Sequence, residues 1–245
     1  MDWLGLRGKR ALVAGAGGIG GAAALALAGA GADVAVADLD VERLTGLAAQ
    51  GIRTIQAGLT DAGGGRECVA RADELLGGLD VFVHAVGVND RRPVLETPDD
   101  VWRAITSVNL DSAFWTGRAA GALMVARGYG RIVFLSSVSG LLAHPHHAPY
   151  AATKGAVNQL ARVMAREWAA SGVTVNAVAP GYTETGLTRE HLEKPGVRAG
   201  LTALVPAGRL GTPGDLTGPI LFLCSDHAAF VTGHVLYADG GRTLV

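Results

Sequence analysis

The sequence predicts an α/β fold: a single-domain, doubly wound Rossmann fold with a seven-stranded, mainly parallel sheet and helices on both faces. Short Val-rich apolar runs alternate with Ala-rich stretches of helical period, an order that gives a parallel sheet with right-handed crossovers. The apolar runs are nearly continuous, which indicates strands buried on both faces. We predict strands at 10–16, 33–39, 53–58, 80–87, 131–137, 173–181 and 234–241, and helices near 19–29, 41–49, 65–77, 98–127, 150–171 and 213–224.

Composition limits the classes of protein that the chain can be. Its 245 residues are ordinary for one α/β unit, so we expect a single domain over residues 1–245. The net charge is -1 and no basic block stands out, which argues against nucleic acid and membrane surfaces as partners. The first residues lack the apolar core and cleavage site of a signal peptide, so we expect a cytoplasmic protein that acts on a small molecule.

The candidate site lies at one edge of the predicted sheet. Ligands of a doubly wound sheet bind beyond the carboxyl ends of its strands, so the residues that close each strand are the candidates. Residues 182–205 follow one of these strands, show weak periodicity and carry Gly186, Pro195, Gly196 and Gly200. We expect this segment to be a mobile insertion that acts as a lid over the substrate.

The stretch GAGGIG, residues 15–20, follows the first predicted strand and opens the first helix. Gly15, Gly17 and Gly20 fit the pattern G-x-G-x-x-G. The first glycine allows a tight turn, and the second lets the backbone approach a pyrophosphate that the helix N-terminus attracts. This context predicts a dinucleotide site; the alternative is a glycine turn that only caps the helix.

Asp38 ends the second predicted strand. A carboxylate at this position accepts hydrogen bonds from the ribose hydroxyls of adenosine and repels a 2′-phosphate. The next residue is Leu39 rather than Arg or Lys, and Gly18 offers no cation either. The sequence therefore predicts NAD rather than NADP as the cofactor, the alternative being that Asp38 is only a solvated turn residue.

Tyr150 and Lys154 lie four residues apart in a predicted helix that starts at Pro149, so they share one helical face. A phenol with its reference pKa of about 10 is a poor base at neutral pH. A lysine ammonium and an oxidised nicotinamide ring both stabilise the phenolate and so bring its pKa toward the range of a general acid–base catalyst. Ser137 ends the fifth strand at the same edge, where its hydroxyl is placed to hold a substrate oxygen.

Three histidines, His144, His146 and His147, precede this helix in a loop that also holds prolines. No cysteine or carboxylate stands near them, so we expect no metal site. Two interpretations stay open: exposed loop residues, or a wall of the substrate pocket formed chiefly by His147. His84, at the end of the fourth strand, is expected to fill a core position as a satisfied imidazole.

Several pieces of the sequence together resemble the short-chain dehydrogenase/reductase superfamily, in its single-domain form of about 250 residues. The resemblance covers essentially the whole chain, and the order and spacing of the pieces are more specific than any one of them. The matching pieces are GAGGIG, Asp38, Asn109 in SVNLDSAFW, the two serines at 136–137, YAATK, VNAVAPGYTET and TGHVLYADGG.

The resemblance implies a Ser–Tyr–Lys–Asn site. Tyr150 would donate and accept the proton, while Lys154 would lower its pKa and bind the nicotinamide ribose. Ser137 would orient the substrate oxygen, and Asn109 would hold a water that links Lys154 to solvent. The implied reaction is hydride transfer between C4 of the nicotinamide and a secondary alcohol or ketone.

The resemblance also implies further contacts and an assembly. Family members are commonly homotetramers built on the helices at 98–127 and 150–171 and the last strand, so we expect a homotetramer or a homodimer. Thr183 would meet the carboxamide through its backbone and Thr185 through its hydroxyl. The expected substrate contacts are Ser139, His147 and Tyr182. The expected cofactor contacts are Gly15, Gly17, Gly18, Ile19, Gly20, Asp38, Leu39, Leu59, Ala85, Gly87, Tyr150, Lys154, Pro180, Gly181, Thr183 and Thr185.

Three departures from the family pattern bear on cofactor affinity. Ala14 stands where a threonine is usual and the glycine loop is one residue shorter, HAVG at 84–87 replaces N-N-A-G, and Gly58 replaces an aspartate. The altered glycine loop and HAVG motivate one alternative, a sensor that binds NAD(H) without turnover. Two further alternatives stay open: an NADPH-dependent 3-ketoacyl reductase, and an epimerase or dehydratase, which fold alone does not exclude. The substrate stays open among sugar acids, acyl thioesters, steroids and secondary-metabolite ketones. No clamp for an acidic substrate is evident, since Arg189 and Arg198 fit solvated surface residues as well as they fit a clamp.

Overall fold

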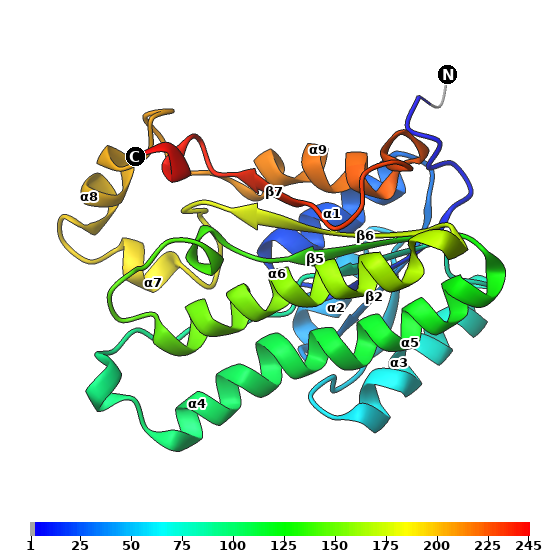
Figure 1. The fold of residues 1–245 in the computed structure, drawn as a ribbon, viewed down its shortest axis with the longest axis horizontal. Coiled ribbons are helices and arrows are strands. Elements are labelled where there is room, and N and C mark those ends of the chain that lie inside the picture. The colour runs from blue at the N-terminus through cyan, green and yellow to red at the C-terminus, as the bar shows by residue number, and fades with distance from the viewer. Residues whose placement is uncertain (1–2) are drawn as a thin grey trace.

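The computed structural model describes residues 3–245 and confirms the predicted fold class. Seven strands form one sheet in the order β3-β2-β1-β4-β5-β6-β7 (Figure 1). Every strand pairing in this sheet is parallel. The strands are β1 (Arg10–Ala14), β2 (Asp33–Asp38), β3 (Arg53–Gln56), β4 (Val81–His84), β5 (Gly130–Leu135), β6 (Val173–Pro180) and β7 (Val235–Ala238).

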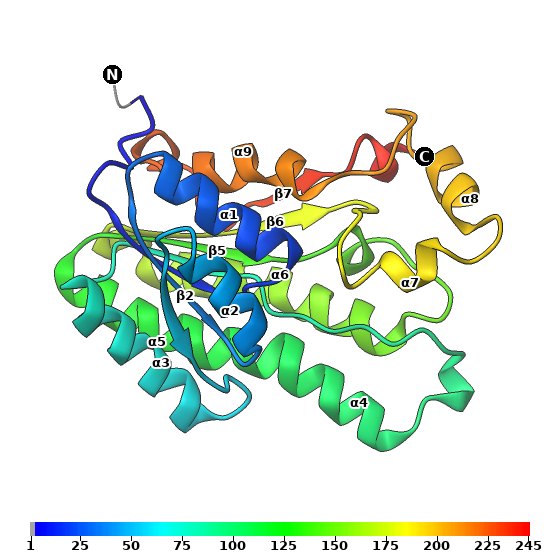
Figure 2. The same cartoon turned by 180° about the vertical axis from the view of Figure 1, so that it is seen from behind.

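Helices cover both faces of the sheet (Figures 1 and 2). One layer is formed by α1 (Gly18–Gly29), α2 (Val41–Ala48) and α9 (Pro213–Cys224), and the other by α3 (Ala62–Leu76), α4 (Asp99–Thr106), α5 (Ser112–Arg127) and α6 (Ala148–Trp168). Short 3-10 helices lie at Val94–Glu96, Val138–Gly140, Ala169–Ser171, Asp226–Ala228 and Arg242–Leu244.

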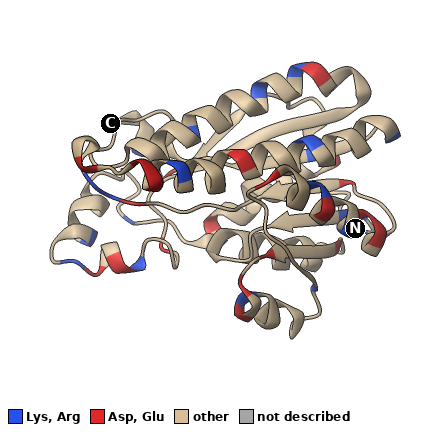
Figure 3. Cartoon of the chain, turned by 90° about the horizontal axis from the view of Figure 1, so that it is seen from below, with Lys and Arg blue, Asp and Glu red and all other residues tan. Residues whose placement is uncertain are grey.

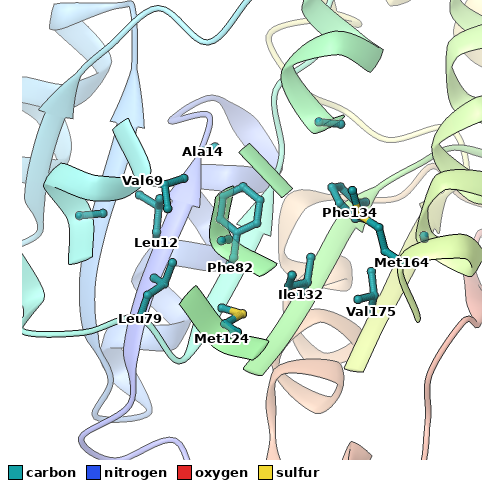
Figure 4. Close-up of a cluster of buried hydrophobic side chains, with 14 of the residues drawn as sticks. Leu12, Ala14, Val69, Leu79, Phe82, Met124, Ile132, Phe134, Met164 and Val175 are labelled. Atoms are coloured by element: carbon teal, nitrogen blue, oxygen red, sulfur yellow. The ribbon is translucent and has the colours of Figure 1, made fainter. Parts of the chain in front are cut away.

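Two hydrophobic cores explain the near-continuous apolar runs of the strands. Successive residues of a strand point to opposite faces, so Phe82 enters the core under α3, α5 and α6 while Val83 enters the core under α1, α2 and α9. Figure 4 shows the first core, in which Phe82 lies near Met124 and Phe134 near Met164. Both faces must be apolar because both are covered.

The strand order reverses beside β1. The chain builds β2 and β3 outward on one side of β1 and then crosses back to place β4 on its other side. The loops that follow β1 and β4 therefore leave the sheet side by side in opposite directions, which opens a crevice at their carboxyl ends. Ala14 pairs with His84 in register, so the glycine loop and the HAVG stretch start from neighbouring positions.

The predicted helix at 98–127 is interrupted by a π turn. Ser107–Asp111 takes π-helical geometry between α4 and α5, and Asn109 sits inside it with no exposed surface. A π turn widens the helix by one residue and is often found at functional sites. Helical periodicity alone does not reveal it, because the same residues also continue an α-helical pattern.

Residues 182–205 are more regular than the sequence indicates. They contain two short helices, α7 (Arg189–Leu192) and α8 (Val197–Ala203), which lie beyond the carboxyl end of β6 (Figure 1). The start of the segment is tied down, since Gly211 donates to the Tyr182 carbonyl across 2.8 Å and accepts from Glu184 N across 2.9 Å. A lid role for the segment stays a prediction.

The surface charges are mixed. Acidic and basic positions are interspersed along the helices in Figure 3, as expected for a chain of net charge -1. Over residues 3–245, no helix combines the length and the apolar character that crossing a membrane requires.

Candidate active site

The glycine loop packs tightly against the loop that follows β4. Gly15 has a φ of 101°, and a Cβ there would lie 2.8 Å from the carbonyl carbon of Ala85. A Cβ on Gly20 would lie 2.0 Å from the Gly15 carbonyl oxygen. Both positions therefore require glycine, the first for its backbone angle and both for the close approach. The turn brings the N-terminus of α1 to the crevice.

A cavity of about 700 Å³ lies between this loop and the segment after β6. The two sides meet at Gly18, where an added Cβ would lie 3.0 Å from the Thr185 side chain. The volume falls within the range of small-molecule and cofactor pockets, and the helix N-terminus at its wall favours a phosphate. The residues present therefore fit a dinucleotide. Among those that line the cavity are Ala16, Gly17, Gly18, Arg43, Thr185 and Arg189.

The Asp38 carboxylate is fixed between the glycine loop and the start of α2. Its Oδ2 accepts from the backbone N–H of Ala16 across 2.6 Å, and its Oδ1 accepts from that of Asp40 across 2.9 Å. The carboxylate thus holds the glycine loop and the start of α2 together. Leu39 beside it is 70% exposed and offers an open apolar surface.

A cation that sequence reasoning missed, Arg43 on α2, also lies beside the glycine loop and lines the cavity. A Cβ on Gly17 would lie 3.1 Å from its Nη1, so the guanidinium covers that glycine. Its Nε lies 3.0 Å from the Asp40 carboxylate, the N-cap of α2. In the sequence, Arg43 is visible as a basic residue five positions after Asp38. Whether its side chain reaches the glycine loop depends on where α2 starts.

Two predicted cofactor residues contribute mainly to packing. Leu59 is 6% exposed in the core under α3, α5 and α6, and Ile19 packs against the opposite core.

Gly181 is required for close approach, because a Cβ there would lie 2.8 Å from Asp239 Cα. The carbonyl of Thr183 accepts from the Thr188 hydroxyl across 2.7 Å, which stabilises the turn that follows Pro180.

Ser137, Tyr150 and Lys154 meet at the carboxyl end of β5. The Ser137 Oγ accepts from Ser139 N across 3.1 Å, and the Ser137 side chain lies close enough to Tyr150 to act on the pKa of its phenol. Lys154, 3% exposed, donates from Nζ to the Leu135 carbonyl across 2.7 Å, and this Nζ lies 5.6 Å from the centroid of the Tyr150 ring. The predicted catalytic side chains are therefore neighbours.

The electrostatics of this group differ from the expectation. Burial raises the pKa of Tyr150, while the Ser137 side chain and the charge of Arg91 act to lower it. Lys154 was expected to be the cation that lowers this pKa, but in the protein alone its ammonium is engaged by the Leu135 carbonyl. Burial lowers the pKa of Lys154 itself to about 8. Ionisation of the phenol at neutral pH therefore calls for further positive charge in the crevice.

Asn109 joins the π turn to the loop after β4. Its Oδ1 accepts from Val88 N across 2.8 Å, and its Nδ2 donates to Val88 O across 2.9 Å. A Cβ on Gly87 would lie 3.6 Å from Asn109 Oδ1 and 3.7 Å from Lys154 Nζ. The side chains of Asn109 and Lys154 thus approach the same glycine.

His84 is in the core, as the sequence predicts. Its Nε2 lies 2.8 Å from Ser112 Oγ, and the Ser112 hydroxyl is 2.6 Å from the Val108 carbonyl, which can only accept. The hydroxyl proton therefore goes to Val108, and His84 donates its Nε2–H to Ser112. Burial lowers the pKa of His84 to about 3, which keeps the imidazole neutral.

The histidine loop forms a wall beside Tyr150. The ring centroid of His147 lies 6.2 Å from that of Tyr150, and the ring of His144 lies 5.8 Å from His147 and 5.6 Å from Tyr182. Ser139 Oγ lies 3.0 Å from His144 Nδ1. The three predicted substrate residues, Ser139, His147 and Tyr182, are therefore brought together, with His144 between them.

His146 stands apart from the other two loop histidines. It is exposed and has a φ of 64°, so the chain turns there and the three rings do not converge. Within residues 3–245 no group of three or more His, Cys, Asp or Glu side chains has an arrangement that would hold a metal ion.

Arg91 is the main site residue that sequence reasoning missed. Its Nε donates to His147 Nε2 across 3.1 Å, and it makes no ion pair with a carboxylate of residues 3–245. By contrast, Arg92 pairs with Asp90. The sequence signal that could have found Arg91 is its place as the first arginine of NDRRP, just beyond the fourth strand at the ligand edge of the sheet. The acid-binding candidate Arg198 instead pairs with Glu184.

Comparison with known proteins agrees with this geometry. The family profile described as enoyl-(acyl carrier protein) reductase matches residues 13–243. The chain belongs to the short-chain dehydrogenase/reductase superfamily. As a member of it, the protein is a nicotinamide-dependent oxidoreductase that acts on CH–OH groups.

Relatives of this short-chain dehydrogenase/reductase include sugar-alcohol and sugar-acid dehydrogenases, beside tropinone reductase homologues and 3-oxoacyl-(acyl-carrier-protein) reductases. Galactitol 2-dehydrogenase of Cereibacter sphaeroides is 43% identical over 192 residues, 78% of this chain and 75% of the relative. Gluconate 5-dehydrogenase of Gluconobacter oxydans is 37% identical over an alignment that covers 99% of this chain and 98% of the length of that relative. The crystal structure of a gluconate 5-dehydrogenase from Burkholderia cenocepacia, in complex with NADP and tartrate, superposes with a TM-score of 0.93 at 36% identity, covering 100% of this chain and 98% of that one.

Proposed function

We propose that the protein transfers a hydride between a nicotinamide cofactor and a secondary hydroxyl of a small polyhydroxylated substrate, a sugar alcohol or sugar acid. The observation that carries the proposal is the meeting of Ser137, Tyr150 and Lys154 at the carboxyl end of β5, at the same sheet edge as the glycine loop. The relatives named for galactitol and gluconate support the substrate class. The polar wall of His144, His147 and Tyr182 suits a substrate with several hydroxyls.

In the proposed oxidation, the substrate hydroxyl lies between Ser137 Oγ and the Tyr150 phenol. The ionised phenol takes the hydroxyl proton, and Ser137 donates a hydrogen bond to the same oxygen. The bound nicotinamide supplies the acceptor for the hydride that leaves the carbon, so the substrate loses one proton and one hydride and becomes a ketone. In reduction the neutral Tyr150 returns the proton to the alkoxide.

The cations of the crevice make this proton transfer feasible. Because burial raises the pKa of Tyr150, the phenolate needs positive charge nearby. Arg91 supplies part of it, and we propose that Lys154 supplies more once a nicotinamide ribose draws its ammonium toward the site. Asn109 would then hold a water beside Gly87 through which Lys154 reaches solvent.

We propose NAD as the preferred cofactor. Asp38 is held beside the cavity with a negative charge that suits ribose hydroxyls and repels a 2′-phosphate. Arg43 is the cation in reach of the same place, but its charge is offset by Asp40, 3.0 Å from its Nε. The Burkholderia structure holds NADP, so the preference has to be measured on this protein.

We further propose a homotetramer that uses α4, α5, α6 and β7. Trp102 on α4, Val163 on α6 and Phe230 before β7 expose large apolar side chains, which a subunit interface would cover. Light scattering behind a sizing column, at micromolar concentration, tests the assembly.

The function is tested with a panel of alditols and aldonates of four to six carbons, each offered with NAD and with NADP. We expect NADH formation with at least one member, and ketone formation in equal amount. Absence of turnover over the whole panel and in the reverse direction with the matching ketones would contradict the proposal.

A further inference from the structure

Arg91 is a half-buried cation without a counter-ion in the described part of the chain, residues 3–245. Burial lowers its pKa, yet a guanidinium keeps its charge in proteins. Its neighbour Arg92 is paired with Asp90, so the carboxylate of this loop is not the partner of Arg91. Charges removed from water are normally paired, which indicates that the partner of Arg91 comes from outside the chain.

The position of Arg91 is the substrate crevice. Its Nε donates to His147, whose ring centroid lies 6.2 Å from that of Tyr150. The ring of His144 lies 5.8 Å from that of His147 and 5.6 Å from that of Tyr182. The guanidinium therefore lies near the reacting hydroxyl and near the start of the segment at 182–205. A ligand held by Tyr150 is within its reach.

His147 fixes the direction in which Arg91 points. The His147 Nδ1 lies 2.9 Å from the Pro145 carbonyl, which can only accept, so Nδ1 carries the proton. Nε2 is then a lone-pair acceptor, and it receives the Nε–H of Arg91 across 3.1 Å. These two contacts hold His147 in one tautomer, and they use only the Nε–H of Arg91. The Nη1 and Nη2 groups of Arg91 have no partner among residues 3–245.

We infer that Arg91 binds the carboxylate of the substrate and that His147 is the residue that positions Arg91 for it. The two Nη groups of a guanidinium match the two oxygens of a carboxylate, a pairing that ammonium groups do not reproduce. Within the proposed function, on which this inference rests, the substrate class narrows from sugar alcohols and sugar acids to hydroxy acids.

The inference is tested by binding rather than turnover. The intact protein is saturated with NADH, which accepts no hydride, and titrated in a calorimeter with D-gluconate and with D-glucitol, the neutral six-carbon alcohol. We expect gluconate to bind at least about tenfold more tightly than glucitol, the factor for one charge-assisted contact. Equal affinity for the two, or no binding of gluconate, would overturn the inference while leaving hydride transfer from neutral alcohols intact.

Variants separate the two residues. Arg91→Gln is expected to weaken gluconate binding to the level of glucitol and to leave the affinity for glucitol unchanged. Arg92→Gln, the matched neighbour, should change neither affinity. His147→Ala should weaken gluconate binding, and His147→Gln, whose amide oxygen can accept from Arg91, should restore part of it. The NADH affinity of each variant shows that it is folded. An Arg91→Gln protein that loses both ligands equally, or neither, would contradict the carboxylate role, and equal behaviour of the two His147 variants would contradict the positioning role.

Discussion

The Nζ of Lys154 donates to the Leu135 carbonyl across 2.7 Å and stays 5.6 Å from the centroid of the Tyr150 ring. The catalytic pair expected from the spacing of YAATK is therefore present, but the lysine is held by the sheet rather than by the phenol. Without its cofactor the protein keeps Tyr150 protonated, because burial raises the pKa of the phenol.

Replacing Lys154 tests whether its charge is needed when the cofactor is bound. Lys154→Met should lower kcat by at least roughly a hundredfold, the lower range for acid–base catalysis. The acid limb of the kcat–pH profile for alcohol oxidation should move to higher pH, since the phenol ionises less readily without the cation. Lys194→Met, an exposed lysine of the 182–205 segment, serves as the control. An unchanged profile in Lys154→Met would assign the lysine to structure alone.

Asp38→Asn tests the cofactor preference. The amide keeps one acceptor for the Ala16 N–H and loses the charge that opposes a 2′-phosphate. We expect the ratio of the NADPH and NADH dissociation constants, measured by nucleotide fluorescence, to fall by about tenfold, which corresponds to about 1.4 kcal/mol. Tighter binding of NADPH than of NADH by the unaltered protein would show that Asp38 does not set the preference.

Asn109→Ala tests the link between the π turn and the loop after β4. The substitution leaves both backbone groups of Val88 without their partners. Losing two hydrogen bonds at about 1 kcal/mol each costs about 2 kcal/mol, so the melting temperature should fall by roughly 4–8 °C, at about 2–4 °C per kcal/mol for a chain of this size. Ser107→Ala in the same turn is the control. Differential scanning calorimetry gives the result, and equal melting of both variants would count against the role assigned to Asn109.

His84 makes the protein sensitive to acid. Its pKa is lowered to about 3 in the fold, so between pH 6.5 and 3 the unfolded chain binds a proton that the folded chain does not. Its contribution to stability is therefore lost as pH falls through this window, by up to about 1.4 kcal/mol per pH unit. His84→Asn should lose less stability than the unaltered protein between pH 6.5 and 4 in urea titrations. Parallel pH dependence of the two proteins would contradict this assignment.

Sequence patterns predicted the sheet and its edge well because the signals are local. Strands buried on both faces must be apolar throughout, and the glycines at 15 and 20 are required by contacts within a single turn. The same reasoning placed Ser137 and Tyr150 at one edge, since carboxyl ends of parallel strands meet there. These features depend on short stretches of chain and on a common rule of packing.

The features that were missed depend on contacts between distant segments. Arg91 acquires its place only when the loop after β4 meets His147, 56 residues later. The π turn around Asn109 has the same apolar pattern as an α-helix, and the short helices α7 and α8 arise in a glycine-containing segment of weak periodicity. The pKa of Tyr150 likewise reflects burial and a remote arginine that spacing along one helix does not report.

The most direct test of the account is Tyr150→Phe, measured in two ways. The substitution removes one hydroxyl and keeps the ring that contacts His147. We predict that hydride transfer in a single turnover, followed by NADH absorbance, falls by at least about a hundredfold while the dissociation constant for NADH stays within about twofold of the unaltered protein. Full hydride transfer by Tyr150→Phe would contradict the assignment of Tyr150 as the acid–base group.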